Sequence, residues 1–330
     1  ERLAPSQSQP IAPEDLAELE QIEQFLIDRY NYSARGVERN WPIFGLPPET
    51  QESTILKIDY NINENNRLEF AYQDTQESQT FDYDRPGSNY VFAAHYYEAP
   101  IDRQRMSLNL FSDISDNLSL EIGYLDIDFD GDVESLGGEE FGHHRIRLSS
   151  GEYAYPTTDQ FRSANKLFTN EEKFHIKGIY TMGNHTITAG YAFHEKFTYN
   201  LFIPYANGRW RWNSVEDFVT GGNANGGLDY MRFIRPTTGV ESDAAAAFDS
   251  EITEFYIEDS IDVSDILTVN FGVRLDAIKT TTPIPYNQSF FNLTGYPNNS
   301  QLDSEIIQPR FGFDLDVSDI LFGSNDFVDS

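Results

Sequence analysis

Apolar and polar residues alternate along this chain from about residue 53 to about residue 316, in runs that come in pairs. The clearest run carries apolar residues at every second position: Leu267, Val269, Phe271, Val273 and Leu275. A period of two is that of a β-strand with one apolar face and one polar face. The pattern predicts about nine antiparallel strands, each of roughly 9–13 residues.

The connections between these runs are short on one side and long on the other. Short polar turns lie at 63–66, 115–118, 183–184, 264–267 and 318–321, and long connections span about 76–101, 130–171, 200–250 and 280–303. This is the layout of an outer-membrane β-barrel. A tilted strand needs about 9–11 residues to cross the hydrocarbon layer, whereas soluble strands more often stop near about 5–6. We therefore predict an all-β fold: an antiparallel up-and-down transmembrane β-barrel segment with short periplasmic turns and long extracellular loops.

The first part of the chain follows another pattern. Proline and two acids at 13–15 mark a helix start. Apolar residues then recur at helical spacing, at Leu16, Leu19, Ile22, Phe25 and Leu26. We expect one short helix over roughly 14–29. The predicted division is an N-terminal loop region with that helix, 1–52, and a partial outer-membrane β-barrel, 53–330.

The composition of the chain limits the binding partners that it can have. The 330 residues carry a formal net charge of −31 and no cysteine. So acidic a chain argues against nucleic acid as a partner, because basic residues must neutralise phosphates. Aromatic residues make up 14% of the chain, which suits strands and the aromatic girdles of membrane barrels. We expect the polar side of the runs to line a barrel interior, through Lys57, Glu69, Arg105, Glu121, Arg274 and Arg310.

Three stretches of sequence resemble the TonB-dependent outer-membrane receptors. FYIEDS at 255–260, with LTVNFGVRLD at 267–276, resembles a hairpin of that family, and QPRFGF at 308–313 resembles the strand after it. KIDYNINENNRL at 57–68 resembles the first hairpin of the Oar-like subgroup. The resemblance spans most of the chain and identifies the barrel rather than the cargo.

The resemblance implies a barrel of about 22 strands with a plug inside it, and uptake powered by the inner-membrane TonB system. About nine strands without a plug or signal peptide lead us to expect an internal piece of a longer protein, folded as an open curved sheet. The implied partners are the TonB complex through a plug absent from this chain, outer-membrane lipid and an unidentified extracellular ligand. The implied location is the cell outer membrane of a Gram-negative bacterium.

An acidic run could hold a hard cation. Asp126, Asp128, Asp130 and Asp132, with Gly131, match the first half of a calcium-binding loop, in which oxygen ligands recur at alternate positions. The closing glutamate of such a loop is missing. Calcium is therefore a weak candidate beside a solvated acidic strand end, and no cofactor is required.

A second cluster follows in the same connection. Glu139, Glu140, His143 and His144 supply carboxylates and imidazoles that could bind a transition metal. Adjacent histidines on an extended chain point in opposite directions, so ordinary loop polarity explains them as well.

The longest connection contains Arg209, Trp210, Arg211 and Trp212. Tryptophan and arginine offer stacking, cation–π contacts and bidentate hydrogen bonds, and they are frequent anchors of binding patches. We predict that these four residues contact a ligand; the alternative is a loop folded on its own aromatic residues. No nucleophile-elbow or other hydrolytic motif stands out, so we expect no enzyme.

Two other functions fit the pattern. A soluble or surface-exposed β-rich module that binds a ligand such as a glycan would place its aromatic residues on one concave face. A small self-contained porin or structural barrel would need these strands to close on themselves. The leading hypothesis is a barrel segment of a TonB-dependent receptor that takes up an unidentified ligand.

Overall fold

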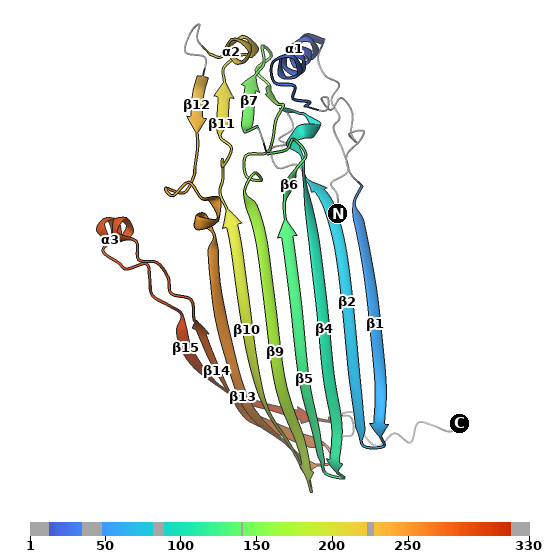
Figure 1. The fold of residues 1–330 in the computed structure, drawn as a ribbon. Coiled ribbons are helices and arrows are strands. Elements are labelled where there is room, and N and C mark those ends of the chain that lie inside the picture. The colour runs from blue at the N-terminus through green and yellow to red at the C-terminus, as the bar shows by residue number, and fades with distance from the viewer. Residues whose placement is uncertain (1–12, 35–47, 82–88, 140, 223–227, 318–330) are drawn as a thin grey trace.

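The computed structural model describes residues 13–34, 48–81, 89–139, 141–222 and 228–317. Its main feature is a tall antiparallel sheet with strands in chain order (Figure 1). The strands of this path are β1 (Thr50–Asn63), β2 (Asn66–Phe81), β4 (Tyr97–Ser115), β5 (Leu118–Asp132), β9 (Asn165–Met182), β10 (His185–Phe202), β13 (Ala246–Ser264), β14 (Leu267–Thr280) and β15 (Asp303–Leu315). The short strand β6 (Glu134–Ser135) pairs with β4. Consecutive pairing with tight turns at one end is the up-and-down arrangement that the sequence predicted.

The strand register sorts side chains onto two faces. One row crosses six neighbouring strands with apolar residues only: Ile58, Phe70, Leu108, Tyr124, Phe174 and Phe193. The next row, on the opposite face, is Asp59, Glu69, Asn109, Gly123, His175 and Ala192. The sheet is thus a wall with an apolar outer face and a polar inner face, as the alternation in the sequence requires.

The strands are longer than the sequence indicated. They run from 13 to 19 residues, compared with the expected 9–13. At about 3.3 Å per residue they exceed the thickness of the hydrocarbon layer even when tilted. The extra length lies at the end of the long connections, where polar residues weaken the alternation and hide the strand from pattern analysis.

The sheet is open. In the described part of the chain, β1 pairs only with β2 and β15 pairs only with β14. β14 and β15 splay away from the other strands at the end that carries α3 and pass behind them at the lower end (Figure 1). This agrees with the expected open, curved sheet.

A second unit, which we call the cap, sits above the sheet at the end of the long connections (Figure 1). Its sheet has the order β12 (Leu228–Arg232), β11 (Arg209–Trp212), β7 (His143–Arg147), β8 (Tyr153–Tyr155) and β3 (Asn89–Val91). The helices α1 (Pro13–Tyr30) and α2 (Val215–Thr220) lie on it, and the short helix η1 (Ala93–His95) adjoins it. The 3-10 helix η2 (Glu241–Ala244) and the helix α3 (Gln288–Thr294) lie in other connections.

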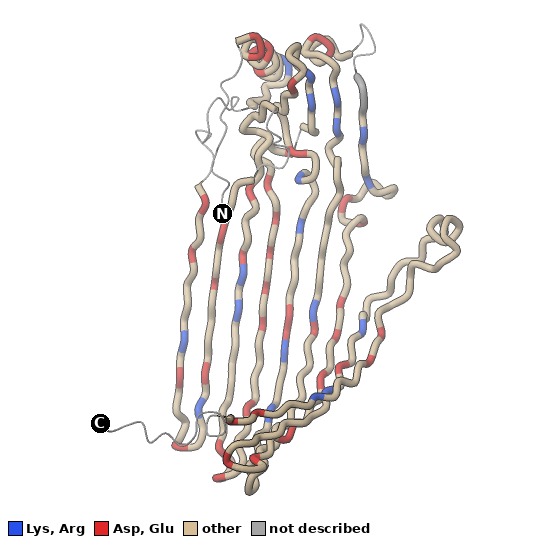
Figure 2. Tube along the Cα trace, turned by 180° about the vertical axis from the view of Figure 1, so that it is seen from behind, with Lys and Arg blue, Asp and Glu red and all other residues tan. Residues whose placement is uncertain are grey.

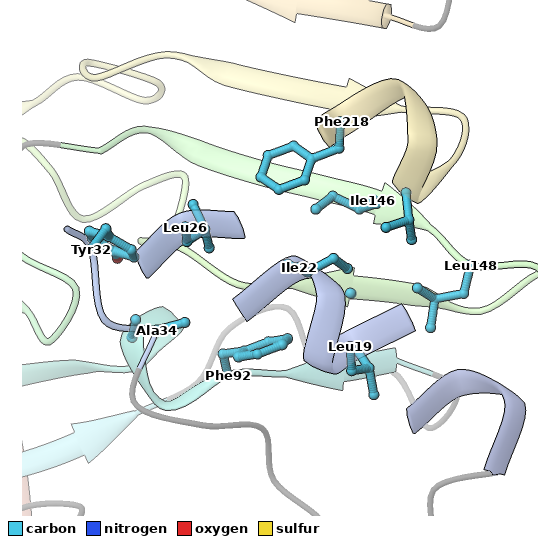
Figure 3. Packing of buried hydrophobic residues seen from close by; sticks show 12 residues of the cluster. Leu19, Ile22, Leu26, Tyr32, Ala34, Phe92, Ile146, Leu148 and Phe218 are labelled. Carbon is cyan, nitrogen blue, oxygen red and sulfur yellow. The ribbon is translucent and has the colours of Figure 1, made fainter. Parts of the chain in front are cut away.

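The main apolar core of the described residues belongs to the cap and not to the tall sheet (Figure 3). α1 confirms the predicted helix and buries Leu19, Ile22 and Leu26 against Ile146 of β7 and Phe218 of α2. Two polar contacts fix the same helix, since Tyr90 donates to Asp15 at 2.7 Å and Ser149 donates to Glu18 at 2.6 Å. The connections expected to be long loops therefore fold into a unit with its own core.

The helices of the described residues include none with the length and apolar character needed to cross a bilayer.

Candidate functional site

The strand β11 lies between β12 and β7 in the cap sheet and contains all four predicted ligand-binding residues. It runs parallel to β7, with Arg209 opposite His143 and Arg211 opposite Arg145. It runs antiparallel to β12, with Arg209 opposite Arg232. Because successive side chains of a strand point to opposite faces, the two tryptophans lie on one face and the two arginines on the other. The four residues, predicted from the sequence to form one patch, are therefore divided between the two faces of the sheet.

The tryptophan face is an aromatic cluster that includes His144 of β7. The His144 ring stacks on Trp210 at 4.8 Å between centroids and lies parallel to Trp212 at 6.1 Å. Phe218 of α2 meets His144 and Trp212 edge-on, at 5.5 and 5.6 Å. Trp212 donates from Nε1 to His144 Nδ1 at 3.0 Å. Nδ1 therefore accepts, and the proton of the neutral ring lies on Nε2.

A cavity of about 520 Å³ opens beside this cluster, between the cap sheet, α1 and α2. Most of its lining residues are apolar or aromatic, among them Tyr30, Phe141, His144, Trp210, Trp212 and Phe218. The volume is within the range of small-molecule sites. Trp210 and Trp212 both line this cavity, and residues of α1 and Phe141, which lie far away in the sequence, complete it. That the tryptophans contact a ligand stays a prediction.

Enclosure among aromatic rings sets the charge of His144. Burial lowers its pKa from 6.5 to about 3, because the charged ring would lose its hydration there. The ring is therefore neutral at pH 7, and the tryptophan face carries no charge from it.

The opposite face of the same sheet is rich in arginine. It presents five guanidinium groups from three adjacent strands: Arg145, Arg147, Arg209, Arg211 and Arg232. Arg145 lies over the Tyr153 ring at 4.1 Å, and Arg209 and Arg232 lie over Tyr205 at 5.4 and 5.2 Å. We call these five residues the arginine face. Figure 2 shows blue segments on the cap strands, above a tall sheet whose strands carry both red and blue segments.

His143 shares this face and is fully buried beside His95 of η1 and Tyr155 of β8, with ring centroids 5.3 and 5.5 Å away. Its pKa lies well below the ordinary value, first because of burial and then because of the charges of His95 and Arg209. His143 and His144 point to opposite sides of β7, as two neighbours on a strand must. They therefore do not converge on one metal ion, and no group of three or more His, Asp or Glu residues in the described part of the chain is placed to hold one. Glu140 lies outside the described residues.

The calcium candidates lie on β5 rather than on a loop. Asp126, Asp128, Asp130 and Asp132 occupy alternate positions of that strand and share one face. An extended strand spaces such residues by about 6.6 Å, too far apart to surround one ion. The carboxylates instead meet neighbours on β9: Asn170 donates to Asp128 at 2.8 Å, and Lys166 bonds Asp132 at 3.0 Å. Calcium binding by this run stays a prediction.

The inner face of the tall sheet carries pairs of opposite charges. Arg274 meets Glu254 at 2.6 Å and Asp276 at 2.7 Å, Lys57 meets Glu69 at 3.5 Å, and Lys177 pairs with Glu121. A cavity of about 720 Å³ on this face is lined from β1 to β15. All six residues expected to face a barrel interior, from Lys57 to Arg310, are among its lining. Gly123 leaves room for the neighbouring His175 ring on this inner face, because a Cβ at residue 123 would lie 2.1 Å from that ring.

An apolar outer face, a charged inner face and consecutive antiparallel strands define this molecule as a wall of an outer-membrane β-barrel. The chain belongs to the outer membrane beta barrel domain family, whose model it matches over residues 15–321. Its place is therefore the bacterial outer membrane. No curated protein is similar to it in sequence.

The fold is shared, at low sequence identity, with a solved copper transporter, and two further structures are less similar. The copper transporter OprC superimposes with a TM-score of 0.50 and 8% identity, over 82% of this chain and 34% of OprC. BauA, the ferric preacinetobactin receptor from Acinetobacter baumannii, has a TM-score of 0.45 and 12% identity, over 79% of this chain and 37% of BauA. The unliganded ferric citrate transporter FecA has a TM-score of 0.40 and 13% identity, over 80% of this chain and 33% of FecA. The chain spans about a third of the length of these proteins.

Proposed function

We propose that this chain is part of the barrel of a TonB-dependent outer-membrane receptor, of the Oar-like subgroup that its first hairpin resembles. In this proposal the protein is a transporter and not an enzyme. The observation that carries the proposal is the two-faced wall, apolar outside and lined with paired charges inside, beneath a folded cap.

The cap supplies the step of ligand capture. It lies at the end of the long connections, which are extracellular in barrels of this layout. It offers a cavity lined by Tyr30, Trp210 and Trp212 on one side of its sheet and the arginine face on the other. A ligand from outside the cell meets these surfaces before it reaches the barrel.

The inner face supplies the path. Its charges are paired across neighbouring strands, as in Arg274 with Glu254 and Lys177 with Glu121. Paired charges keep the wall hydrated without a strong net field, so that a polar ligand can pass along it. The same groups can exchange partners with a plug, which in this proposal connects the barrel to the TonB complex.

The test uses the full-length natural protein in detergent extracts of outer membranes. We expect it to be retained on immobilised periplasmic domain of TonB, while an unrelated porin from the same extract stays in the unbound fraction. If the protein is present in the extract and is not retained, the receptor proposal is wrong and a structural or porin barrel takes its place.

A further inference from the structure

The arginine face concentrates positive charge in a strongly acidic chain. The chain has 23 Lys and Arg against 54 Asp and Glu. Five of the 23 lie on one face of three adjacent cap strands. Two pairs stand directly opposite each other in register: Arg145 with Arg211, and Arg209 with Arg232. Like charges in directly opposed positions destabilise a sheet, so the arrangement costs stability in the absence of an anion.

Four of these five arginines differ from several basic residues of the tall sheet, which are paired with carboxylates. On the tall sheet, Lys57, Arg67, Lys177, Arg274 and Lys279 each have a carboxylate within ion-pair distance. In the cap, no carboxylate of the described residues lies within 4.0 Å of the side-chain nitrogens of Arg145, Arg147, Arg209 or Arg232. The acids of the chain are abundant, yet none of the described residues places a carboxylate against these four arginines.

The guanidinium groups are held in place and can still be reached. The rings of Tyr153 and Tyr205 support Arg145, Arg209 and Arg232 through cation–π contacts. Arg147 and Arg232 are exposed, and Arg145 and Arg209 are partly exposed. A guanidinium positioned on a ring keeps its planar fork free for a carboxylate or phosphate. The cost of ordering these long side chains on binding is correspondingly reduced.

We propose that the arginine face binds a small soluble ligand that carries two or more carboxylate or phosphate groups. Adjacent strands lie about 4.8 Å apart, and alternate residues of one strand about 6.6 Å apart. Anionic groups with this separation, as in a tricarboxylate or a linear polyphosphate, reach guanidinium groups on two strands at once. The inference rests on the proposed function only in taking this ligand as the cargo of the receptor.

The probes are citrate and tripolyphosphate, titrated by calorimetry into the full-length natural protein in detergent at low salt. We expect saturable binding of at least one probe and weaker binding as salt rises. Arg145→Gln and Arg209→Gln should each reduce the affinity about tenfold, since a charge-assisted hydrogen bond is lost. Arg145→Lys should retain part of the affinity, because it keeps the positive charge. Arg103→Gln is the control, because Arg103 is an exposed arginine on β4 outside this face.

A second measurement separates binding from folding. Each probe should raise the melting temperature of the cap in the unsubstituted protein and in Arg103→Gln, and should do so much less in Arg145→Gln. Binding of neither probe at millimolar concentration, or equal loss in Arg103→Gln, would overturn the inference. If the protein is retained on TonB but binds neither probe, only this inference is wrong. If it binds a probe but is not retained, the receptor proposal is wrong and the anion site remains.

Discussion

Two glycines determine where the Trp210 ring lies in the cap. A Cβ on Gly142 would lie 2.2 Å from Trp210 Cζ3, and a Cβ on Gly208 would lie 2.2 Å from Trp210 Cη2. Gly208 also has φ +91°, a conformation that favours glycine. The indole therefore packs on bare backbone, and any side chain at these positions must displace it.

Gly208→Ala should loosen the aromatic cluster, and Gly151→Ala is its matched control. Gly151 has φ +94° but open space around its Cα, so both substitutions carry the same backbone cost of about 1–2 kcal/mol. Only Gly208→Ala adds overpacking, for which we expect a further cost of about 1–3 kcal/mol. Thermal unfolding followed by tryptophan fluorescence measures the difference. Equal losses in the two variants would show that Trp210 does not pack on this glycine.

As the pH falls, the cap should lose folding stability before the barrel wall does. Burial lowers the pKa of His144 to about 3 and that of His143 well below its ordinary value. Because the folded pKa lies below the unfolded value of 6.5, the unfolded cap binds protons first. Stability is then full above about pH 6.5 and falls as the pH drops from there towards 3.

The expected slope is up to about tenfold in the unfolding equilibrium per pH unit for each histidine. Tryptophan fluorescence should report the change between pH 7 and 4 while the far-ultraviolet circular dichroism of the strands persists. His144→Phe keeps a ring in the stack and should flatten the slope. A cap whose stability is unchanged over this range would contradict the neutral state of these two rings.

At the residue scale, the sequence predicted Arg209–Trp212 as one binding patch in a long loop and did not show that the segment is a strand. Alternation within Arg209–Trp212 already implied opposite faces if the segment was a strand. What the sequence could not show was that β7 and β12 flank it and bring three more arginines into register. Those neighbours come from connections more than 60 residues apart in the case of β7 and β11, and no local pattern encodes that pairing.

At the element scale, α1 joins the beginning of the chain to its long connections. Its spacing predicted the helix and its apolar stripe correctly, because both are local properties. Its partners, Ile146, Leu148 and Phe218, were not predicted, because they lie in connections whose strands have only three to five residues. Strands that short give too few alternations to be recognised.

The packing of α1 can be tested with two isoleucines of the same helix. Ile22 is fully buried in the cap core, and Ile27 is 42% exposed. Ile22→Ala should destabilise the cap by about 2–5 kcal/mol through loss of contacts and a cavity, whereas Ile27→Ala should cost well under half of that. Hydrogen exchange of β7 and β8 amides measures cap opening directly. If the two variants exchange alike, α1 does not share a core with the cap sheet.

At the scale of the whole molecule, the alternation of apolar and polar residues is enough to predict a sheet with one apolar and one polar face. The strand register then places polar residues such as Asp59, Glu69 and His175 in one inner row. Nine strands were expected, and nine long strands form the path through the described residues. The cap is the part that the sequence did not reveal. It is stabilised by contacts between distant connections, whereas the wall follows from neighbours along the chain.

The most direct test of the account is cysteine labelling of the full-length natural protein in intact cells. This chain has no cysteine of its own, and both Ser150 in the cap and Asp116 in a short turn are exposed. With a membrane-impermeant maleimide, we expect Ser150→Cys to be labelled in intact cells and Asp116→Cys only after the outer membrane is permeabilised. The opposite pattern, or a protein recovered without membranes, would contradict a barrel wall with its cap outside the cell.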